Sequence, residues 1–127
     1  MHEASLAQGL LKTALKAVEA HNAAHPSAPV RRIVELRCEL GLISCVEPRT
    51  LAACFEILTE GTLAEGAKLK LDIAPLACRC AACGHAFTLT RRRFVCPQCG
   101  DENIHFNGGH GMTLMAMRVA SEDTEHE

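Results

Sequence analysis

The sequence predicts an α+β fold in which a small three-stranded sheet with two helices carries an inserted four-cysteine zinc-ribbon domain. Two segments repeat apolar residues with the helical period, and others alternate with the period of a strand. Four cysteines follow in two CxxC pairs, between the second and the third predicted strand. At 127 residues, the chain has room for one domain with a modest core and a metal-stapled appendage.

The first predicted helix covers residues 5–24. Its apolar residues recur at helical spacing, with polar residues such as Lys12 and Lys16 between them. We expect the helix to end before residues 25–29, because Pro26 and Pro29 cannot continue its hydrogen bonds. The apolar positions are Leu6, Leu10, Leu11, Ala14, Leu15 and Val18.

Three segments are predicted as strands. Two of them alternate apolar and charged residues, which is the pattern of a half-buried strand. The first of these ends at Gly41, and Pro75 closes the second. Strand order and direction do not follow from the pattern. The predicted strands cover residues 34–40, 68–73 and 112–119.

The second predicted helix lies between the first two strands. It begins near Pro48, which suits the first helical position, and it ends before Gly61. One face carries Leu51, Cys54, Phe55 and Leu58. The expected organisation is an α+β domain of residues 1–75 and 106–120, a zinc-ribbon domain of residues 76–105, and a flexible polar tail of residues 121–127.

Cys80, Cys83, Cys96 and Cys99 form two CxxC knuckles, each followed by glycine and separated by twelve residues. This spacing is typical of zinc ribbons, because zinc takes four soft or borderline ligands in a tetrahedron and each knuckle supplies two thiolates. Four protein ligands leave no position for water or substrate, so the predicted site is structural. A redox CxxC pair is disfavoured, since thioredoxin-type motifs occur singly in a βαβ setting.

Several residues near the knuckles have more than one interpretation. Cys78 is a bystander thiol or part of a competing CxC chelate, and His85 is a surface side chain or a substitute zinc ligand in acid. Residues 91–93, all arginine, mark the exposed tip of a hairpin or bind an acidic partner. Phe87, Leu89 and Phe94 are expected to pack over the zinc cluster.

The composition excludes several classes of function. A formal net charge of −2 offers no electrostatic basis for binding nucleic acid. We see no signal peptide and no membrane span, and eight cysteines without an export signal indicate metal ligation or buried thiols. The expected compartment is the cytoplasm. Cys38 and Cys54 lie on apolar faces and are predicted as core thiols.

The amino terminus begins Met1-His2-Glu3, where a free amine, peptide nitrogens and an imidazole lie close together in sequence. Ni(II) favours square-planar arrangements of nitrogen and oxygen donors, and a terminus can wrap around such an ion. Taken alone, this signal is weak. His21, His25, His105, His110 and His126 are interpreted as surface or satisfied histidines, with His110 the one most worth testing.

Short motifs along nearly the whole chain share an order and spacing with one family. They are Met1-His2-Glu3 with Ser5-Leu6-Ala7, Leu40-Gly41-Leu42-Ile43-Ser44 leading to Glu47-Pro48, Ala53-Cys54-Phe55-Glu56, Gly61-Thr62, Glu65-Gly66-Ala67-Lys68-Leu69, both CxxC knuckles, and Gly111. With these motifs the sequence resembles the HypA/HybF family of hydrogenase nickel-insertion accessory proteins. Ile43 and Arg49 depart from the residues usual in that family, but neither touches a metal motif.

The resemblance implies a nickel metallochaperone whose α+β domain binds Ni(II) at the amino terminus, apart from a structural zinc ion. His2 would supply imidazole and backbone nitrogen, and Glu3 would supply backbone nitrogen and charge. Glu47, at the start of the second helix, is a weaker candidate. The implied partners are a nickel-loading maturation GTPase and the large subunit of a nickel-iron hydrogenase, with no nucleic acid and no membrane.

Two other functions compete with this interpretation. A zinc-ribbon adaptor could bind nucleic acid or protein through residues 91–93, but net acidity and the lack of aromatic stacking residues disfavour nucleic acid. An enzyme is disfavoured because no nucleophile–base pair, open metal site or phosphate loop is found. The sequence leaves open which hydrogenase is served, whether urease is a second client, and whether the protein forms a homodimer.

Overall fold

The computed structural model describes residues 2–121, which form two compact units. The first unit is made of the described parts of Met1–Cys38, Val46–Leu71 and Leu114–Glu127. The second unit is made of Glu39–Cys45 and Asp72–Thr113. The predicted ribbon, residues 76–105, lies inside this second unit, which also takes in the end of the first predicted strand and the segment that follows it. Of the predicted tail, only Ser121 is among the described residues.

Helix α1 spans Glu3–Ala24 and begins two residues before the predicted start. It ends at the predicted residue, and His25 forms its C-cap with a backbone N–H that donates to the carbonyl of His21. The face of α1 that is buried carries mainly small and branched apolar side chains, so other elements can pack closely against it. These residues are Ala7, Leu10, Leu11, Ala14 and Val18.

Helix α2 spans Pro48–Leu58 and packs against α1 in the first unit. Its N-cap is Glu47, whose side chain accepts a hydrogen bond from the backbone N–H of Thr50 at 3.0 Å. Pro48 occupies the first turn, where its missing N–H has no intrahelical partner to lose. Leu51 and Phe55 are buried, as the predicted apolar face requires.

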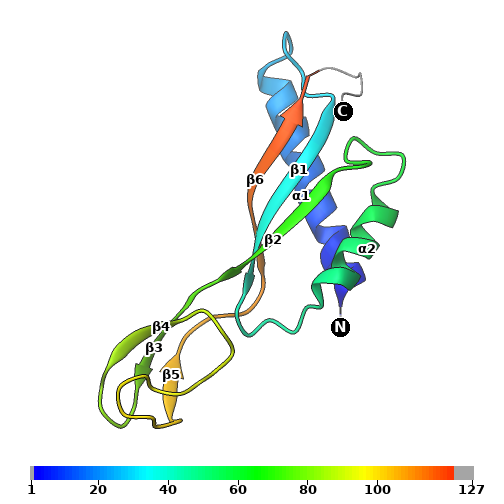
Figure 1. The fold of residues 1–127 in the computed structure, drawn as a ribbon. Helices are drawn as coiled ribbons and strands as arrows, with labels where there is room; N and C mark the ends of the chain where they lie inside the picture. Colours follow the sequence, from blue (N-terminus) through cyan, green and yellow to red (C-terminus); the bar gives the residue numbers. More distant parts are fainter. Residues whose placement is uncertain (1, 122–127) are drawn as a thin grey trace. The chain divides into compact units, whose positions relative to one another are not determined.

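The first sheet has the order β2-β1-β6, with β1 (Arg32–Gly41) between β2 (Lys68–Ala74) and β6 (Met112–Ala120). Arg31, just before β1, donates its backbone N–H to the carbonyl of Ala120 at the end of β6. Gly41, at the end of β1, donates its N–H to the carbonyl of Gly111, just before β6. β1 and β6 therefore run antiparallel. Figure 1 shows α1 lying behind the strands of this sheet.

The second sheet lies in the second unit and has the order β4-β3-β5. Its strands are β3 (Leu76–Cys80), β4 (Ala86–Leu89) and β5 (Ile104–Phe106), and β3 pairs antiparallel with both neighbours. Leu42 forms a small buried cluster with Leu76 and Cys78 of β3. Five partly buried apolar residues pack against it: Ile43, Phe87, Leu89, Phe94 and Ile104.

The α+β fold class with a four-cysteine ribbon is confirmed by this arrangement. The hairpin made by β3 and β4 turns at residues 81–85, the first knuckle, so the arginine run at residues 91–93 follows β4 and does not mark the hairpin tip. That expectation was wrong, because the CxxC turn itself reverses the chain. Within residues 2–121, no helix has both the length and the apolar character needed to cross a bilayer.

At Gly41, in the second unit, there is no space for a side chain. A Cβ atom there would lie 2.2 Å from the carbonyl oxygen of Gly109. This close approach accompanies two backbone hydrogen bonds, from Gly41 to Gly111 and from Ile43 to Gly109. The end of β1 is thus tied to the segment that enters β6.

Candidate metal centres

The four knuckle cysteines meet at one point in the second unit. Their Sγ atoms all lie within 4.8 Å of one another, and within residues 2–121 they are the only group of at least three His, Cys, Asp or Glu side chains so arranged. The Sγ atoms of Cys80 and Cys99 are 3.6 Å apart, and those of Cys83 and Cys96 are 3.7 Å apart. Each of these close pairs therefore joins a cysteine of the first knuckle to a cysteine of the second.

The two knuckles share one hydrogen-bond pattern. In each, the N–H of the glycine donates to the carbonyl of the first cysteine at 2.9 Å. The N–H of that cysteine donates, also at 2.9 Å, to the carbonyl of the residue that follows the glycine. The glycines have φ angles of 77° and 81°, a left-handed conformation that costs other residues free energy. The equivalent residues are Cys80, Gly84 and His85 in one knuckle, and Cys96, Gly100 and Asp101 in the other.

Each knuckle contributes one buried and one exposed thiol. Cys80 and Cys96 are 1% and 2% exposed, whereas Cys83 and Cys99 are exposed. Cys96 Sγ also accepts hydrogen bonds from the backbone N–H groups of Gln98 and Cys99, both at 3.4 Å. Such N–H groups stabilise a negative sulfur.

The thiols do not ionise independently. Burial raises the pKa of Cys96, but the backbone N–H groups of Cys99 and Gln98, together with the neighbouring thiols of Cys83 and Cys99, lower it to about 7. The N–H of Asp101 lowers the pKa of Cys99, but the adjacent Cys80 thiol and burial raise it to about 12. One thiolate therefore forms readily and further negative charge is resisted. A cation is what allows all four sulfurs to be thiolates together.

The donor set fits a zinc ion. Four sulfurs about 2.3 Å from zinc lie about 3.8 Å from one another in a tetrahedron. Two of the six sulfur separations, 3.6 and 3.7 Å, agree with that geometry, and all six are within 4.8 Å. Cadmium or iron also accept four thiolates, so the geometry alone does not name the metal.

Cys78 and His85 lie outside the four-sulfur group. Cys78 is buried in the core of the second unit, where its Sγ donates to the carbonyl of Leu76 at 3.5 Å. Burial raises the pKa of this thiol, which suits an uncharged core residue and not a ligand. His85 stacks on Phe87 with ring centroids 5.8 Å apart. His110 is exposed.

Arg92 has a role that the sequence did not indicate. Its Nε donates to the carbonyl of Leu42 at 2.7 Å, and its Nη2 donates to the carbonyl of Ser44. These carbonyls belong to the Glu39–Cys45 segment of the second unit. Arg92 therefore acts as a clamp within this unit, although it is exposed, as residues 91 and 93 are. The only sequence signal was the run of three arginines, which does not say which one reaches back to the backbone.

The amino terminus belongs to the first unit. His2 is the N-cap of α1, and its carbonyl accepts the N–H of Leu6 at 2.9 Å. The His2 side chain is exposed and makes no capping hydrogen bond. Glu3 is buried at 6% exposure, and its Oε2 accepts the backbone N–H of Glu47 at 2.8 Å. The backbone of Glu47 thus lies beside Glu3, while its carboxylate caps α2.

The family described as "HypA: Hydrogenase/urease nickel incorporation, metallochaperone, hypA" matches residues 1–119. The chain belongs to the HypA family. A hydrogenase maturation factor HypA from Dechloromonas aromatica is 35% identical over 119 residues, which cover 94% of this chain and 99% of the relative. A hydrogenase maturation factor HypA from Escherichia coli K12 is 32% identical over 123 residues, covering 96% and 100%.

Two solved structures share the fold. The solution structure of the Ni metallochaperone HypA from Helicobacter pylori aligns with a TM-score of 0.57 at 22% identity, covering 96% of this chain and 100% of that one. A second solution structure of a HypA protein aligns with a TM-score of 0.59 at 22% identity, covering 96% and 98%. At this level of identity the structures support the fold only.

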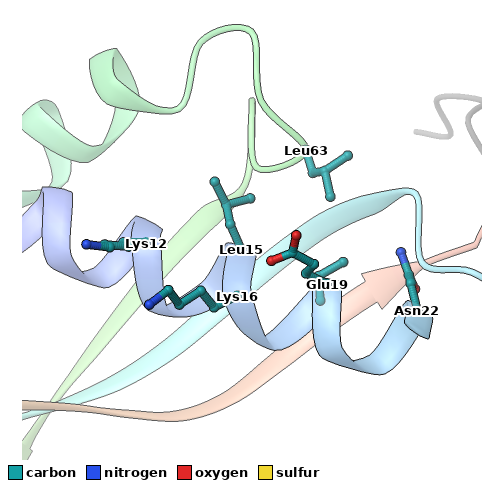
Figure 2. Close-up of a pocket in the computed structure, with 7 residues that line it drawn as sticks. Lys12, Leu15, Lys16, Glu19, Asn22 and Leu63 are labelled. Atoms are coloured by element: carbon teal, nitrogen blue, oxygen red, sulfur yellow. The ribbon is translucent and has the colours of Figure 1, made fainter. Parts of the chain in front are cut away.

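Membership of the HypA family makes this chain a nickel-incorporation metallochaperone and maturation factor, and not an enzyme. A groove of about 420 Å³ runs along α1 and is closed on one side by Leu63 (Figure 2). Apolar Leu15 and Val18 lie beside the charged Lys12, Lys16 and Glu19 in its lining.

Proposed function

We propose that the protein binds Ni(II) at its amino terminus through His2 and Glu3 and delivers it to nickel-iron hydrogenase during maturation. The observation that carries the proposal is the difference in exposure and hydrogen bonding between two neighbouring side chains, His2 and Glu3. The His2 imidazole is exposed and makes no cap, while the Glu3 carboxylate is buried against the backbone of Glu47. One residue is positioned to bind a cation, and the other anchors it to the fold.

The donor types at this end of α1 match the cargo. Ni(II) accepts square-planar nitrogen donors, which an imidazole and adjacent deprotonated backbone amides provide. His2 precedes the hydrogen-bonded ladder of α1, so using its own amide nitrogen breaks no helical bond. Glu3 brings negative charge, which offsets the positive end of the helix dipole. Glu47 holds the Glu3 carboxylate and is not required as a ligand.

The two metal centres would have opposite exchange properties. One centre would be a resident zinc ion, fully coordinated by Cys80, Cys83, Cys96 and Cys99. Its role would be to cross-link the two knuckles and so stabilise the second unit. The amino-terminal site is open to solvent and partly made of backbone, so nickel can leave it for another protein. Eight free cysteines suit a reducing compartment, and we place this activity in the cytoplasm.

A titration of zinc-loaded protein with nickel tests the amino-terminal site. The His2→Ala variant is expected to lose the tightest nickel binding of the protein. Its zinc content and circular dichroism should stay unchanged, because His2 is exposed and far in sequence from the thiols. His105→Ala removes another exposed histidine and is the control. Adding residues before Met1 should weaken nickel binding only if the terminal amine is a ligand. Wild-type affinity in His2→Ala would contradict the assignment.

A cellular assay tests delivery. In cells without the native copy, His2→Ala is expected to give low hydrogenase activity that excess nickel partly restores, because mass action can replace a carrier. Loss of activity that no nickel supplement relieves would show a role other than delivery. Urease activity in the same cells reports whether that enzyme is a second client.

The groove along α1 is our candidate contact for a nickel-loading maturation GTPase, which would then pass nickel towards the hydrogenase large subunit. Lys12 and Lys16 line the groove beside apolar side chains, a mixture typical of transient interfaces. Lys12→Glu with Lys16→Glu should weaken capture of that GTPase in pull-downs. Arg91→Glu with Arg93→Glu changes the charge equally on exposed residues of the ribbon, and should not. Equal binding by both double variants would exclude this surface.

A further inference from the structure

Two histidines stack at the carboxyl end of α1, away from its proposed nickel-binding end. The ring centroids of His21 and His25 are 4.4 Å apart, and the planes differ by 19°. His21 lies in the last turn of α1 and His25 is the C-cap, and both side chains are exposed. Residues four apart on a helix share one face, which explains the contact.

A hydrogen bond fixes which nitrogen of His25 is available. His25 Nδ1 lies 3.1 Å from the carbonyl oxygen of His21. A carbonyl oxygen only accepts, so Nδ1 carries the proton and Nε2 keeps its lone pair. Metal-bound histidines commonly donate their second ring nitrogen to a carbonyl in this way, which orients the ligand. The backbone N–H of His25 donates to the same carbonyl at 2.9 Å and holds the residue in place.

The electrostatics of this helix end also favour a cation. The last carbonyl groups of a helix carry partial negative charge, which attracts cations within the final turn. Two imidazoles at a four-residue helical spacing form the pair found in helical zinc motifs. Zinc, copper and nickel all accept imidazole nitrogen.

We propose that His21 and His25 form a second, surface metal site that takes a late first-row divalent cation, Ni²⁺ included. In the stacked arrangement the ring nitrogens point side by side, so binding turns the exposed His21 ring until both imidazoles face one ion. Two protein donors leave coordination positions for water or for a donor from another molecule. The site is therefore open and exchanges its ion with solution. It uses neither His2 nor the four cysteines, and it goes beyond the proposed function.

The test begins with zinc-loaded protein that carries His2→Ala, so that the amino-terminal site is removed. NiCl₂ is added, and binding is followed by calorimetry and by the amide resonances of ¹⁵N-labelled protein. We expect nickel to bind this protein and to broaden the resonances around residues 21–25. Adding His21→Ala or His25→Ala should lower the affinity at least about tenfold, because one imidazole lacks the effective concentration of a pair.

A spacing variant is the matched control. Ala23 is exposed, so Ala23→His combined with His25→Ala keeps the number of histidines but places them two residues apart. Side chains at that spacing do not face each other on a helix, so this variant should bind as weakly as His25→Ala. His105→Ala should leave binding unchanged. Zinc is measured throughout, so that displacement from the cysteines is recognised.

Two results would overturn the site. One is nickel binding in the His2→Ala background that neither His21→Ala nor His25→Ala weakens. The other is the absence of any nickel binding once His2 is replaced. The second result leaves the proposed amino-terminal site intact. Conversely, if His2→Ala in the otherwise native chain leaves nickel affinity unchanged and His21→Ala abolishes it, the proposed function fails and this site stands.

Discussion

The two compact units of this chain differ in what stabilises each of them. In the first unit, buried side chains of α1, α2 and β1 form an apolar core that includes Leu10, Ile33 and Phe55. In the second unit, the described buried cluster at β3 is smaller. It consists of Leu42, Leu76 and Cys78, with partly buried apolar residues packed against them. A core this small rarely holds a segment folded without a metal or disulfides. We therefore expect the second unit to depend on a metal bound by the four cysteines, and the first unit to fold without one.

Removing the metal should give the largest effect and the sharpest separation of the units. Structural zinc contributes about 10–16 kcal/mol of apparent binding free energy in small zinc domains. Cys96→Ser removes a buried ligand, and should abolish zinc binding and unfold the second unit. Amide exchange should become fast in the ribbon strands, while α1 and α2 stay protected. Cys45→Ser, at an exposed thiol outside the cluster, is the control. Loss of protection in α1 would break the comparison.

A core substitution in α2 should have the reverse effect. Phe55 is 2% exposed, and replacing a buried phenylalanine by alanine costs about 3–5 kcal/mol. Phe55→Ala should therefore lower the unfolding midpoint of the first unit in urea, while zinc content stays at the wild-type level. Ile57→Ala lies in the same helix at 66% exposure and should change little. Zinc loss in Phe55→Ala would show that the units fold as one.

Arg92 allows a smaller test inside the ribbon. Its guanidinium bonds to the carbonyls of Leu42 and Ser44, and hydrogen bonds to charged groups contribute about 1.5–3 kcal/mol. Arg92→Ala should make the zinc easier to remove by a chelator and should raise amide exchange in residues 42–44. Arg91→Ala removes an exposed neighbour and should match wild type. Identical chelation rates in the two variants would exclude the clamp.

Cys38 gives the smallest expected effect and is a probe of the first unit. It is fully buried, and burial raises the pKa of its thiol from 9.0 to about 11. The folded state therefore holds the thiol proton more tightly than the unfolded state. Its contribution to stability is present below pH 9 and is lost as the pH rises towards 11. Iodoacetamide at pH 8 should label exposed Cys45 well before Cys38, with or without zinc. Fast labelling of Cys38 after zinc removal would mean that the first unit had opened.

Local patterns predicted the elements, and long-range contacts were what they missed. Apolar spacing predicted α1, α2 and the three strands of the first sheet to within about two residues at each end, and the CxxC spacing predicted the four-thiol cluster. Nothing local showed that Leu42 and Ile43 pack with the ribbon, or that Arg92 reaches back fifty residues to Leu42. Such contacts depend on how the chain returns on itself. The His21 and His25 spacing was visible, but their stacking and tautomer were not.

The hydrogen bonds from Gly41 to Gly111 and from Ile43 to Gly109 also bear on how a newly made chain folds. β6 is the last strand to be synthesised, and until it arrives the central strand β1 has one unpaired edge. An unpaired apolar edge is a template for aggregation. The ribbon is made before β6, and a ribbon folded around a metal would shorten the loop that has to close before Gly41 pairs with Gly111. We therefore expect the supply of that metal during synthesis to affect how long this edge of β1 stays unpaired.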